Sequence, residues 1–355
     1  MRNSAVDCLN SDSPLDIRLP VAVCDYDCLS CICDYARRNC FRMAFGALIL
    51  FFGLLFDRII GDPVSRFHPV VLLGNLIGLW GKTNTYPKSA ERFVGILGWL
   101  ITVIICLIPC VLIGLFAPAW VFAVFSVFAL SFSIGWRSLE EHVRNVETAL
   151  LKGEGAGRAE VSKMVSRSTA GLTFEQIRSG AYESAAENLV DSIIAPIFWF
   201  VVFELLFGMG ICGAVLFRAA NTMDAMLGYR DDRIRIGWFA ARMDDILAFI
   251  PARITGLILL IIYAVSGKGK SAWGVFIRDR KKRPGFNGGI PMSLIAGGCG
   301  IQFDKPGVYT IGNPVRTLES GGNAVIRSLR AASLFAAAVG IVLMIVLRTP
   351  VFLIF

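Results

Sequence analysis

Long uncharged stretches alternate with polar segments along this chain. Residues 94–116, 117–136 and 331–347 contain no charged side chain, and residues 193–217 contain only Glu204. An α-helix rises about 1.5 Å per residue and the hydrocarbon layer of a bilayer is about 30 Å thick, so roughly 20 apolar residues cross it. The pattern therefore predicts an all-α, polytopic membrane protein with about four to six hydrophobic segments, rather than a soluble protein with buried core helices.

Three of these segments are irregular. Residues 43–60 are shorter than a full span, and glycines interrupt the second half of residues 193–217. In residues 249–265, the apolar part after Arg253 is only about a dozen residues, or about 18 Å of helix. Either the last two segments both cross the bilayer, or both enter it and return. We expect the second arrangement, which leaves residues 137–331 on one side of the membrane.

Two turns and two helices are predicted around the uncharged stretches. Residues 94–136 should form a helical hairpin that turns at Ala117-Pro118. The polar segment 137–192 begins with apolar residues at helical spacing, and the glycines of residues 153–157 should break that helix. Thr173-x-x-Gln176 has the pattern of a capping box, so a second helix should begin after Thr173. The apolar positions of the first helix are Leu139, Val143, Val146 and Leu150.

The net charge of +8 is confined to one segment. Residues 266–331 hold eleven Lys and Arg residues against three Asp and Glu residues, which equals the whole excess. A basic run can indicate nucleic-acid binding, but in a membrane protein it more often marks a cytoplasmic segment. We therefore predict a multi-pass protein of the cell membrane that binds no nucleic acid, with its polar segments in the cytoplasm.

The first 42 residues differ from the rest of the chain. They are polar and lack helical periodicity, and six of the ten cysteines precede residue 41. The spacing of Cys24, Cys28 and Cys31 would suit an iron–sulfur cluster, since thiolates at such spacing can converge on one centre. We favour the simpler hypothesis that residues 1–42 are a disordered or non-native extension and that residues 43–355 form a single membrane-embedded domain.

Acidic and amide side chains recur beside the apolar segments. Asn188-x-x-Asp191 and Asn221-x-x-Asp224 share one spacing, and residues i and i+3 lie on the same face of a helix. The pair Asp244-Asp245 follows. Clusters of carboxylate and amide oxygens suit Mg²⁺, which prefers hard ligands and usually retains water and substrate phosphate. The alternative is that these residues are helix caps and surface ion pairs.

Several motifs together resemble one family, the adenosylcobinamide-phosphate synthases (CobD/CbiB) of cobalamin biosynthesis, in its archaeal form. The resemblance runs from about residue 43 to residue 330. One position departs from it, because the family usually has an aspartate where this chain has Ser168. The motifs are Asp57-Arg58-Ile59-Ile60-Gly61-Asp62-Pro63, His68-Pro69-Val70, Arg167-Ser168-Thr169, Glu183-x3-Glu187-Asn188-x2-Asp191, Asn221-Thr222-Met223-Asp224, Ala241-Arg242-Met243-Asp244-Asp245, Ile250-Pro251-Ala252-Arg253, Asn287-Gly288-Gly289 and Lys305-Pro306-Gly307-x-Tyr309.

The resemblance implies an acid–amine ligase. Such an enzyme joins a corrinoid carboxylate, that of adenosylcobyric acid, to aminopropanol or its O-phosphate, and it is expected to use ATP and Mg²⁺. ATP and Mg²⁺ come from the resemblance and from the chemistry, because the chain has no Walker-type phosphate loop. Its partners would be these substrates, the lipid bilayer and other membrane-associated cobalamin enzymes.

Site roles follow from this chemistry. An amine arrives as ammonium and must lose a proton to a base, and cationic side chains stabilise a phosphoryl group during transfer. The predicted catalytic residues are Glu183, Glu187, His68, Arg167 and Arg242; the predicted cofactor-binding residues are Asn188, Asn221, Arg253 and Asn287; the predicted metal ligands are Asp191, Asp224, Asp244 and Asp245.

Two other functions fit parts of the pattern. An intramembrane prenyltransferase also binds a diphosphate through Mg²⁺, but it needs a deep apolar groove for a lipid tail. A transporter would carry ionisable residues within its spans, where Glu204 is the sole candidate.

Overall fold

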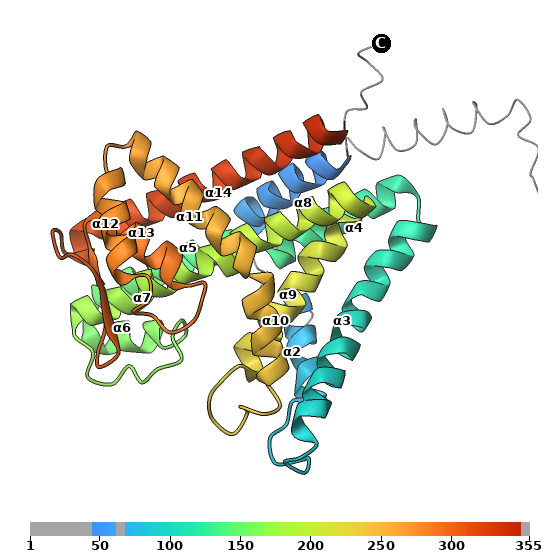
Figure 1. The fold of residues 1–355 in the computed structure, drawn as a ribbon, viewed down its shortest axis with the longest axis horizontal. Coiled ribbons are helices and arrows are strands. Elements are labelled where there is room, and N and C mark those ends of the chain that lie inside the picture. The colour runs from blue at the N-terminus through green and yellow to red at the C-terminus, as the bar shows by residue number, and fades with distance from the viewer. Residues whose placement is uncertain (1–44, 62–67, 349–355) are drawn as a thin grey trace, which may run out of the picture. The chain divides into compact units, whose positions relative to one another are not determined.

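The computed structural model describes residues 45–61 and 68–348, and these residues are almost entirely helical (Figure 1). The predicted extension, residues 1–42, lies outside the described residues. A first helix covers residues 45–60. The other elements are α2 (Pro69–Trp80), α3 (Glu91–Phe116), α4 (Ala119–Ser133), α5 (Trp136–Leu150), α6 (Glu154–Val161), α7 (Phe174–Leu189), the π-helix η1 (Val190–Ile194), α8 (Ala195–Phe207), α9 (Gly210–Leu227), α10 (Trp238–Leu247), α11 (Phe249–Val265), α12 (Gly269–Asp279), α13 (Gly289–Cys299), β1 (Gln302–Lys305), β2 (Tyr309–Gly312) and α14 (Leu318–Arg348).

Four helical stretches of the described chain are long and apolar enough to cross a membrane. They are Glu91–Phe116, Ala119–Leu150, Phe174–Phe207 and Leu318–Leu347, and a fifth is possible if α10 and α11, bent by 40°, act as one span. This agrees with the predicted all-α membrane fold and its number of hydrophobic segments. The turn between α3 and α4 falls at Ala117-Pro118, where the sequence placed it.

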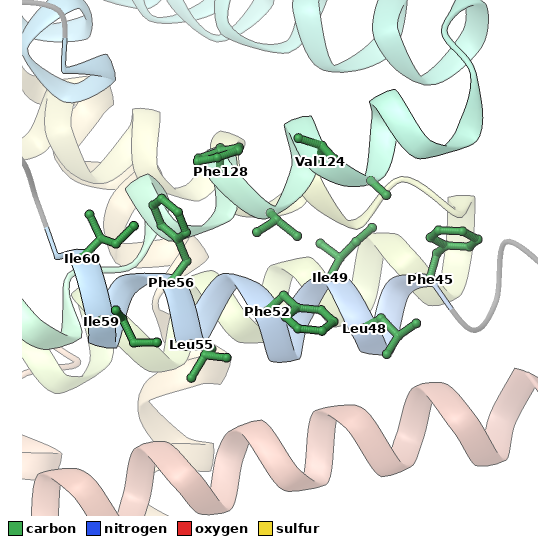
Figure 2. Close-up of a pocket in the computed structure, with 12 residues that line it drawn as sticks. Phe45, Leu48, Ile49, Phe52, Leu55, Phe56, Ile59, Ile60, Val124 and Phe128 are labelled. Atoms are coloured by element: carbon green, nitrogen blue, oxygen red, sulfur yellow. The ribbon is translucent and has the colours of Figure 1, made fainter.

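The first helix presents an apolar surface along its length. It packs against α14, where Leu50 lies close to Gly340. With α4 it lines a groove of about 470 Å³, and Figure 2 shows that all twelve lining side chains are apolar. Phe52 and Val124, which line it, are about half exposed. A protein surface of this composition is stable against hydrocarbon rather than water, which supports placing this helix in the bilayer.

The amphipathic pattern after the hairpin forms the helix that it predicted. In α5 the buried side chains include Leu139, Val143, Val146 and Leu150. The glycines that follow do not simply break the helix, because α6 begins at Glu154 within that segment and only Gly153 has a positive φ. The capping box of Thr173 and Gln176 is present at the start of α7.

Buried charges join the polar ends of three helices. Glu140 of α5 is 3% exposed, and its carboxylate accepts hydrogen bonds from Trp136 and Arg330. Arg58 of the first helix lies 3.3 Å from the same carboxylate, and Arg144 lies 3.6 Å from it. Because a buried carboxylate is stable only when it is paired and hydrogen-bonded, this cluster fixes the first helix and α14 against α5.

The segment 193–217 is not one helix but part of a helical hairpin. α8 ends at Phe207, Gly208 adopts φ 68°, and α9 runs back along α8. A Cβ atom at Gly213 would lie 2.1 Å from the carbonyl oxygen of Trp199, so the two helices touch backbone to backbone. The hairpin therefore returns the chain to the level of η1, and whether residues 193–217 cross the bilayer or enter it and return stays a prediction.

The segment 249–265 is longer than the sequence suggested. α11 starts at Phe249 and has 17 residues, so its length is about 25 Å rather than about 18 Å. Arg253, which was expected to limit the apolar part, lies inside this helix with its guanidinium bonded to backbone carbonyls. Whether α10 and α11 cross the bilayer or return stays a prediction.

The basic segment, residues 266–331, folds into helices and a pair of strands, although its sequence had been interpreted only as a topology signal. It contains α12, α13, the antiparallel pair β1–β2 and nearly half of α14, which begins thirteen residues before the predicted span at residue 331. Asp279 is fully buried; burial opposes its ionisation, but hydrogen bonds from Arg278, Lys282 and the Gly312 N–H hold its pKa well below its usual range. These contacts tie α12 to β2.

The topology can be tested by cysteine labelling. Ser162, Arg230 and Lys268 are exposed and stand on the three polar segments. With one cysteine at each position in a cysteine-free background, we expect all three to react with a membrane-impermeant maleimide from the same side. Labelling of position 230 from the opposite side would contradict this topology.

Candidate active site

Three acidic side chains form a row along one helix. Glu183, Glu187 and Asp191 are spaced by four residues on α7 and η1, so they share a face and span about 12 Å. Asp191 is in the single π-helical turn of the described chain. Such turns rotate the following side chains relative to a regular helix and are frequent at functional sites. The sequence does not reveal this turn.

The α8–α9 hairpin and α10 bring the other acidic motifs to this row. Asn221 of α9 donates a hydrogen bond from Nδ2 to Oδ1 of Asp244, at 3.2 Å. The charge of Asp224 acts on both Asp191 and Asp244. The three motifs from residues 187–191, 221–224 and 244–245 therefore converge, as the hypothesis of one shared site requires.

Arg283 lies at the centre of the carboxylate row. Its guanidinium forms an ion pair with Glu187, and its charge also acts on Asp191 and Asp224. The residue comes from the segment between α12 and α13, about a hundred residues away from Glu187. Because several carboxylates repel one another at short range, a cation in their midst allows them to stay ionised together.

Two cavities adjoin the row. The larger, of about 760 Å³, is lined by Asp224, Tyr229, Arg242, Asp245 and Arg283 among others. The smaller, of about 500 Å³, is named here the Arg167 cavity, and its lining includes Arg167, Glu183, Glu187, Asn188, Asp191 and Lys305. Tyr229 lines both, and the Arg283–Glu187 ion pair joins a residue of one lining to a residue of the other.

Glu183 is positioned by a strand far along the chain. It is 6% exposed, and its Oε1 accepts a hydrogen bond of 2.7 Å from the hydroxyl of Tyr309 on β2. Burial and the nearby Glu183 carboxylate raise the pKa of Tyr309, so the phenol stays protonated and can donate. The second oxygen, Oε2, lies 3.6 Å from Nη2 of Arg167. Glu183 is thus a buried carboxylate facing a cavity, as a general base requires.

The pKa of the Asp224 carboxyl group is raised above its ordinary value. Burial raises its pKa to about 6, and the charges of Asp245 and Glu187 add to this effect, while Arg283 opposes it. In the folded protein, the carboxyl group of Asp224 is therefore ionised only above about pH 6.

This shift leads to a pH-dependence prediction. Because a metal ligand must be deprotonated, Mg²⁺ affinity should rise as the pH increases from about 5 to about 7, through the pKa of Asp224. In the absence of metal the sign is opposite: the native state holds this proton up to about pH 6, whereas the unfolded chain loses it near the ordinary pKa of 3.8, so stability should fall as the pH rises from about 4 to about 6. Titration of Mg²⁺ binding and thermal unfolding at several pH values measure both. In Asp224→Asn the pH dependence of Mg²⁺ binding and that of thermal stability should both flatten. Unchanged pH profiles would contradict the role of Asp224 as a titrating metal ligand.

The other predicted site residues lie in different surroundings. Asn188 lines the Arg167 cavity and donates to Ser184, and Arg242 is exposed beside the larger cavity. Arg253 and Asn287 bond to each other at 2.6 Å, and Asn287 donates to the carbonyl of Asp245. Arg253 and Asn287 thus hold the segment before α13 against α10, and neither is among the residues that line the two cavities.

His68 also lies apart from the cluster. It is the N-cap of α2, where its Nδ1 accepts from the backbone N–H of Val70, and its ring packs edge-on against Phe132. Within the described residues it lines neither cavity. The structure therefore gives His68 a capping role and does not bring it to the acidic residues.

Three residues that approach the site were not singled out as site residues from the sequence. Arg283 belongs to the basic run, which was interpreted only as a topology signal. Lys305 and Tyr309 belong to a family motif to which no role was assigned. No spacing rule links these residues to α7, because they reach it through the fold of the segment after α12.

The donor set suits Mg²⁺ bound in part by substrate. Among the described residues, no group of three or more His, Cys, Asp or Glu side chains is arranged to hold a metal ion. Mg²⁺ is commonly held by one or two carboxylates together with phosphate and water, and Asp191, Asp224 and Asp244 supply hard oxygen atoms of this kind. The residues therefore fit a shared Mg–phosphate complex rather than a closed structural metal centre.

Comparison with known proteins gives a consistent result. The family model described as "CobD/Cbib protein" matches residues 50–349. A "Probable cobalamin biosynthesis protein CobD" of Methanothermobacter thermautotrophicus is 36% identical over 274 residues, covering 77% of this chain and 89% of that protein. The protein of the same description from Methanocaldococcus jannaschii is 36% identical over 290 residues, covering 78% and 92%.

Similarity extends to bacteria. The "Cobalamin biosynthesis protein CobD" of Geobacter metallireducens is 33% identical over 291 residues, covering 78% of this chain and 89% of that protein. No solved structure matches the chain. The matched region contains the described acidic residues and both cavities.

Proposed function

The chain belongs to the CobD/CbiB family of cobalamin biosynthesis, and we propose that it is the amide synthase of that pathway. The reaction would join the carboxylate of a corrinoid acid to aminopropanol or its O-phosphate. The observation that carries this proposal is the convergence of three acidic motifs where two cavities adjoin. An enzyme that joins two substrates with the help of a nucleotide needs such a meeting point of binding sites.

Bound Mg-ATP would supply a phosphoryl group that turns the unreactive carboxylate into an acyl phosphate. The chain's own residues would then have three tasks. Asp191, Asp224 and Asp244 would orient the metal-bound phosphates, and Arg283 would offset negative charge during transfer.

The third task is removal of a proton from the incoming ammonium. Glu183 fits it best, because it is buried, faces the Arg167 cavity and is held by Tyr309. The neutral amine could then attack the acyl carbon, forming the C–N bond as the C–O bond to phosphate breaks. Glu187, the other candidate base, is occupied by Arg283.

A direct assay tests the proposal. Purified full-length protein is incubated with a corrinoid acid, Mg-ATP and aminopropanol phosphate or aminopropanol, and the corrinoid product is weighed by mass spectrometry. We expect a product whose mass equals that of acid plus amine minus one water, together with ADP and phosphate. Recovery of unchanged corrinoid acid from folded protein would refute the proposed reaction.

Neither rival gains support. The apolar groove of Figure 2 shares no lining residue with the two cavities, so it does not lead a lipid tail to the acidic cluster. Glu204, on which a transporter hypothesis rested, accepts a hydrogen bond from the Gly210 N–H at the α8–α9 turn.

A further inference from the structure

The Arg167 cavity has an unusual feature: the nitrogens of the Arg167 guanidinium are buried but donate no hydrogen bond to the described residues. The nitrogens Nε, Nη1 and Nη2 of Arg167 are excluded from solvent and have no hydrogen-bond partner among the described residues. Glu183 is its ion-pair partner, at 3.6 Å, which is too long for a hydrogen bond. A guanidinium carries five N–H donors, and leaving such donors unpaired in a buried position costs free energy. Buried unsatisfied groups in native structures commonly mark the place of a missing ligand or water.

The surrounding chain leaves room for this guanidinium. A Cβ atom at Gly180 would lie 3.3 Å from Arg167 Nη2 and equally close to Val161. The absence of a side chain at Gly180 thus lets Nη2 of Arg167 lie close to α7. A branched side chain such as valine at this position would displace the guanidinium from its place in the cavity wall.

Further groups around the guanidinium favour an anion with several oxygens. Lys163 and Lys305 line the same cavity, as do the hydroxyl-bearing Ser162, Ser166 and Ser184. The acidic residues Glu187 and Asp191 lie farther along α7, about 6 Å and about 12 Å from Glu183. The cations Arg167 and Lys305 therefore lie near a single carboxylate, that of Glu183, and the other two carboxylates of the lining lie farther along α7.

We propose that the Arg167 cavity binds the phosphoryl group of a phosphate monoester, at a position distinct from the Mg²⁺-binding carboxylates and without need of metal. Arg167 offers paired N–H donors that match two phosphate oxygens, and Lys305 of the same lining supplies a second cation. The role in catalysis rests on the proposed function, but the binding itself does not. The monoester could belong to a nucleotide or to a small phosphorylated amine, and the two sources are separated experimentally.

The test measures binding to the full-length protein in detergent, with EDTA present and no corrinoid. Isothermal titration is carried out with inorganic phosphate, with O-phosphoethanolamine against ethanolamine, and with AMP against adenosine. We expect the phosphate-bearing member of at least one pair to bind and its dephosphorylated counterpart not to bind. Tighter binding of O-phosphoethanolamine than of AMP identifies a small phosphorylated amine as the source, and the reverse identifies a nucleotide.

Variants locate the site. Arg167→Gln should weaken phosphate binding by about 10-fold or more, because it removes a charge-assisted pair of hydrogen bonds. Gly180→Val should weaken it too, by displacing the guanidinium. Arg316→Gln removes an exposed cation outside the cavity and should have no effect. Asp191→Asn should retain binding if the site is distinct from the metal ligands.

The outcomes separate this inference from the proposed function. Equal binding of phosphorylated and dephosphorylated probes, or unchanged binding in a folded Arg167→Gln protein, overturns the inference even if amide synthesis is observed. Binding that depends on Arg167 in a protein that makes no amide supports the site and refutes the proposed function. Thermal unfolding checks the folding of each variant, and the Glu183 carboxylate left without its ion-pair partner in Arg167→Gln is expected to lower the melting temperature.

Discussion

Replacing Asp191, Asp224 or Asp244 by asparagine is expected to slow amide formation by about 100-fold or more in each case. The substitution is nearly isosteric, but it removes a negative charge from a group proposed to orient Mg-phosphate. The three side chains act on one another electrostatically, so they should behave as one unit. Double mutants should therefore be little worse than single ones, as for residues that serve a common step. The loss of rate in single and double mutants is measured from initial rates at saturating Mg²⁺ and from the Mg²⁺ concentration that gives the half-maximal rate.

A matched control is available nearby. Asp232 is an exposed aspartate in the segment between α9 and α10, and it lines neither cavity. Asp232→Asn should leave the rate unchanged. Near-normal rates in all three cluster variants would show that the acidic motifs are structural, and the reacting groups would have to be sought elsewhere.

Arg283→Gln is expected to have the second largest effect, a loss of rate of about 100-fold. The variant leaves Glu187, Asp191 and Asp224 without the cation that acts on all three. Unneutralised carboxylates would hold their protons to higher pH, so the activity remaining should shift toward alkaline pH. Rate profiles between about pH 5 and about pH 9 reveal the shift.

A double-mutant cycle isolates the contact itself. Glu187→Gln combined with Arg283→Gln should be less impaired than the sum of the two single effects, because each single change leaves one charge unpaired. Arg280→Gln is the control: Arg280 donates to the carbonyl of Ile277 and stacks on Phe276, and it lies outside both cavities. Additive effects at Glu187 and Arg283 would mean that their ion pair has no part in catalysis.

Local patterns predicted local structure well. The apolar spacing of Leu139, Val143, Val146 and Leu150 corresponds to the buried face of α5, and the capping box at Thr173 starts α7. Both depend on contacts within a few residues, which helical geometry fixes. The convergence of the three acidic motifs was expected only on the condition that residues 193–217 and 249–265 enter the bilayer and return, an arrangement that the sequence left open.

Long-range features could not be predicted in the same way. Arg283 reaches Glu187 only because α12, α13 and the strands fold back on α7, and charge statistics describe the basic segment without giving its fold. The π-helical turn at Asp191 adds one residue to a turn of the helix, and the spacing of apolar positions did not reveal it. A rigid setting between prolines fits a helix cap as well as a catalytic base, and the structure shows the cap at His68.

The α8–α9 hairpin has polar open ends and an exposed apolar tip. Asp191 and Asp224 stand near its two open ends, while its tip at Gly208 is apolar, with Leu206 and Phe207 about two-thirds exposed. Side chains of this kind are stabilised by hydrocarbon, and the two arms of the hairpin meet backbone to backbone at Gly213. A hairpin whose tip lies in lipid and whose open ends carry Asp191 and Asp224 would link the thickness of the surrounding bilayer to the separation of these two carboxylates.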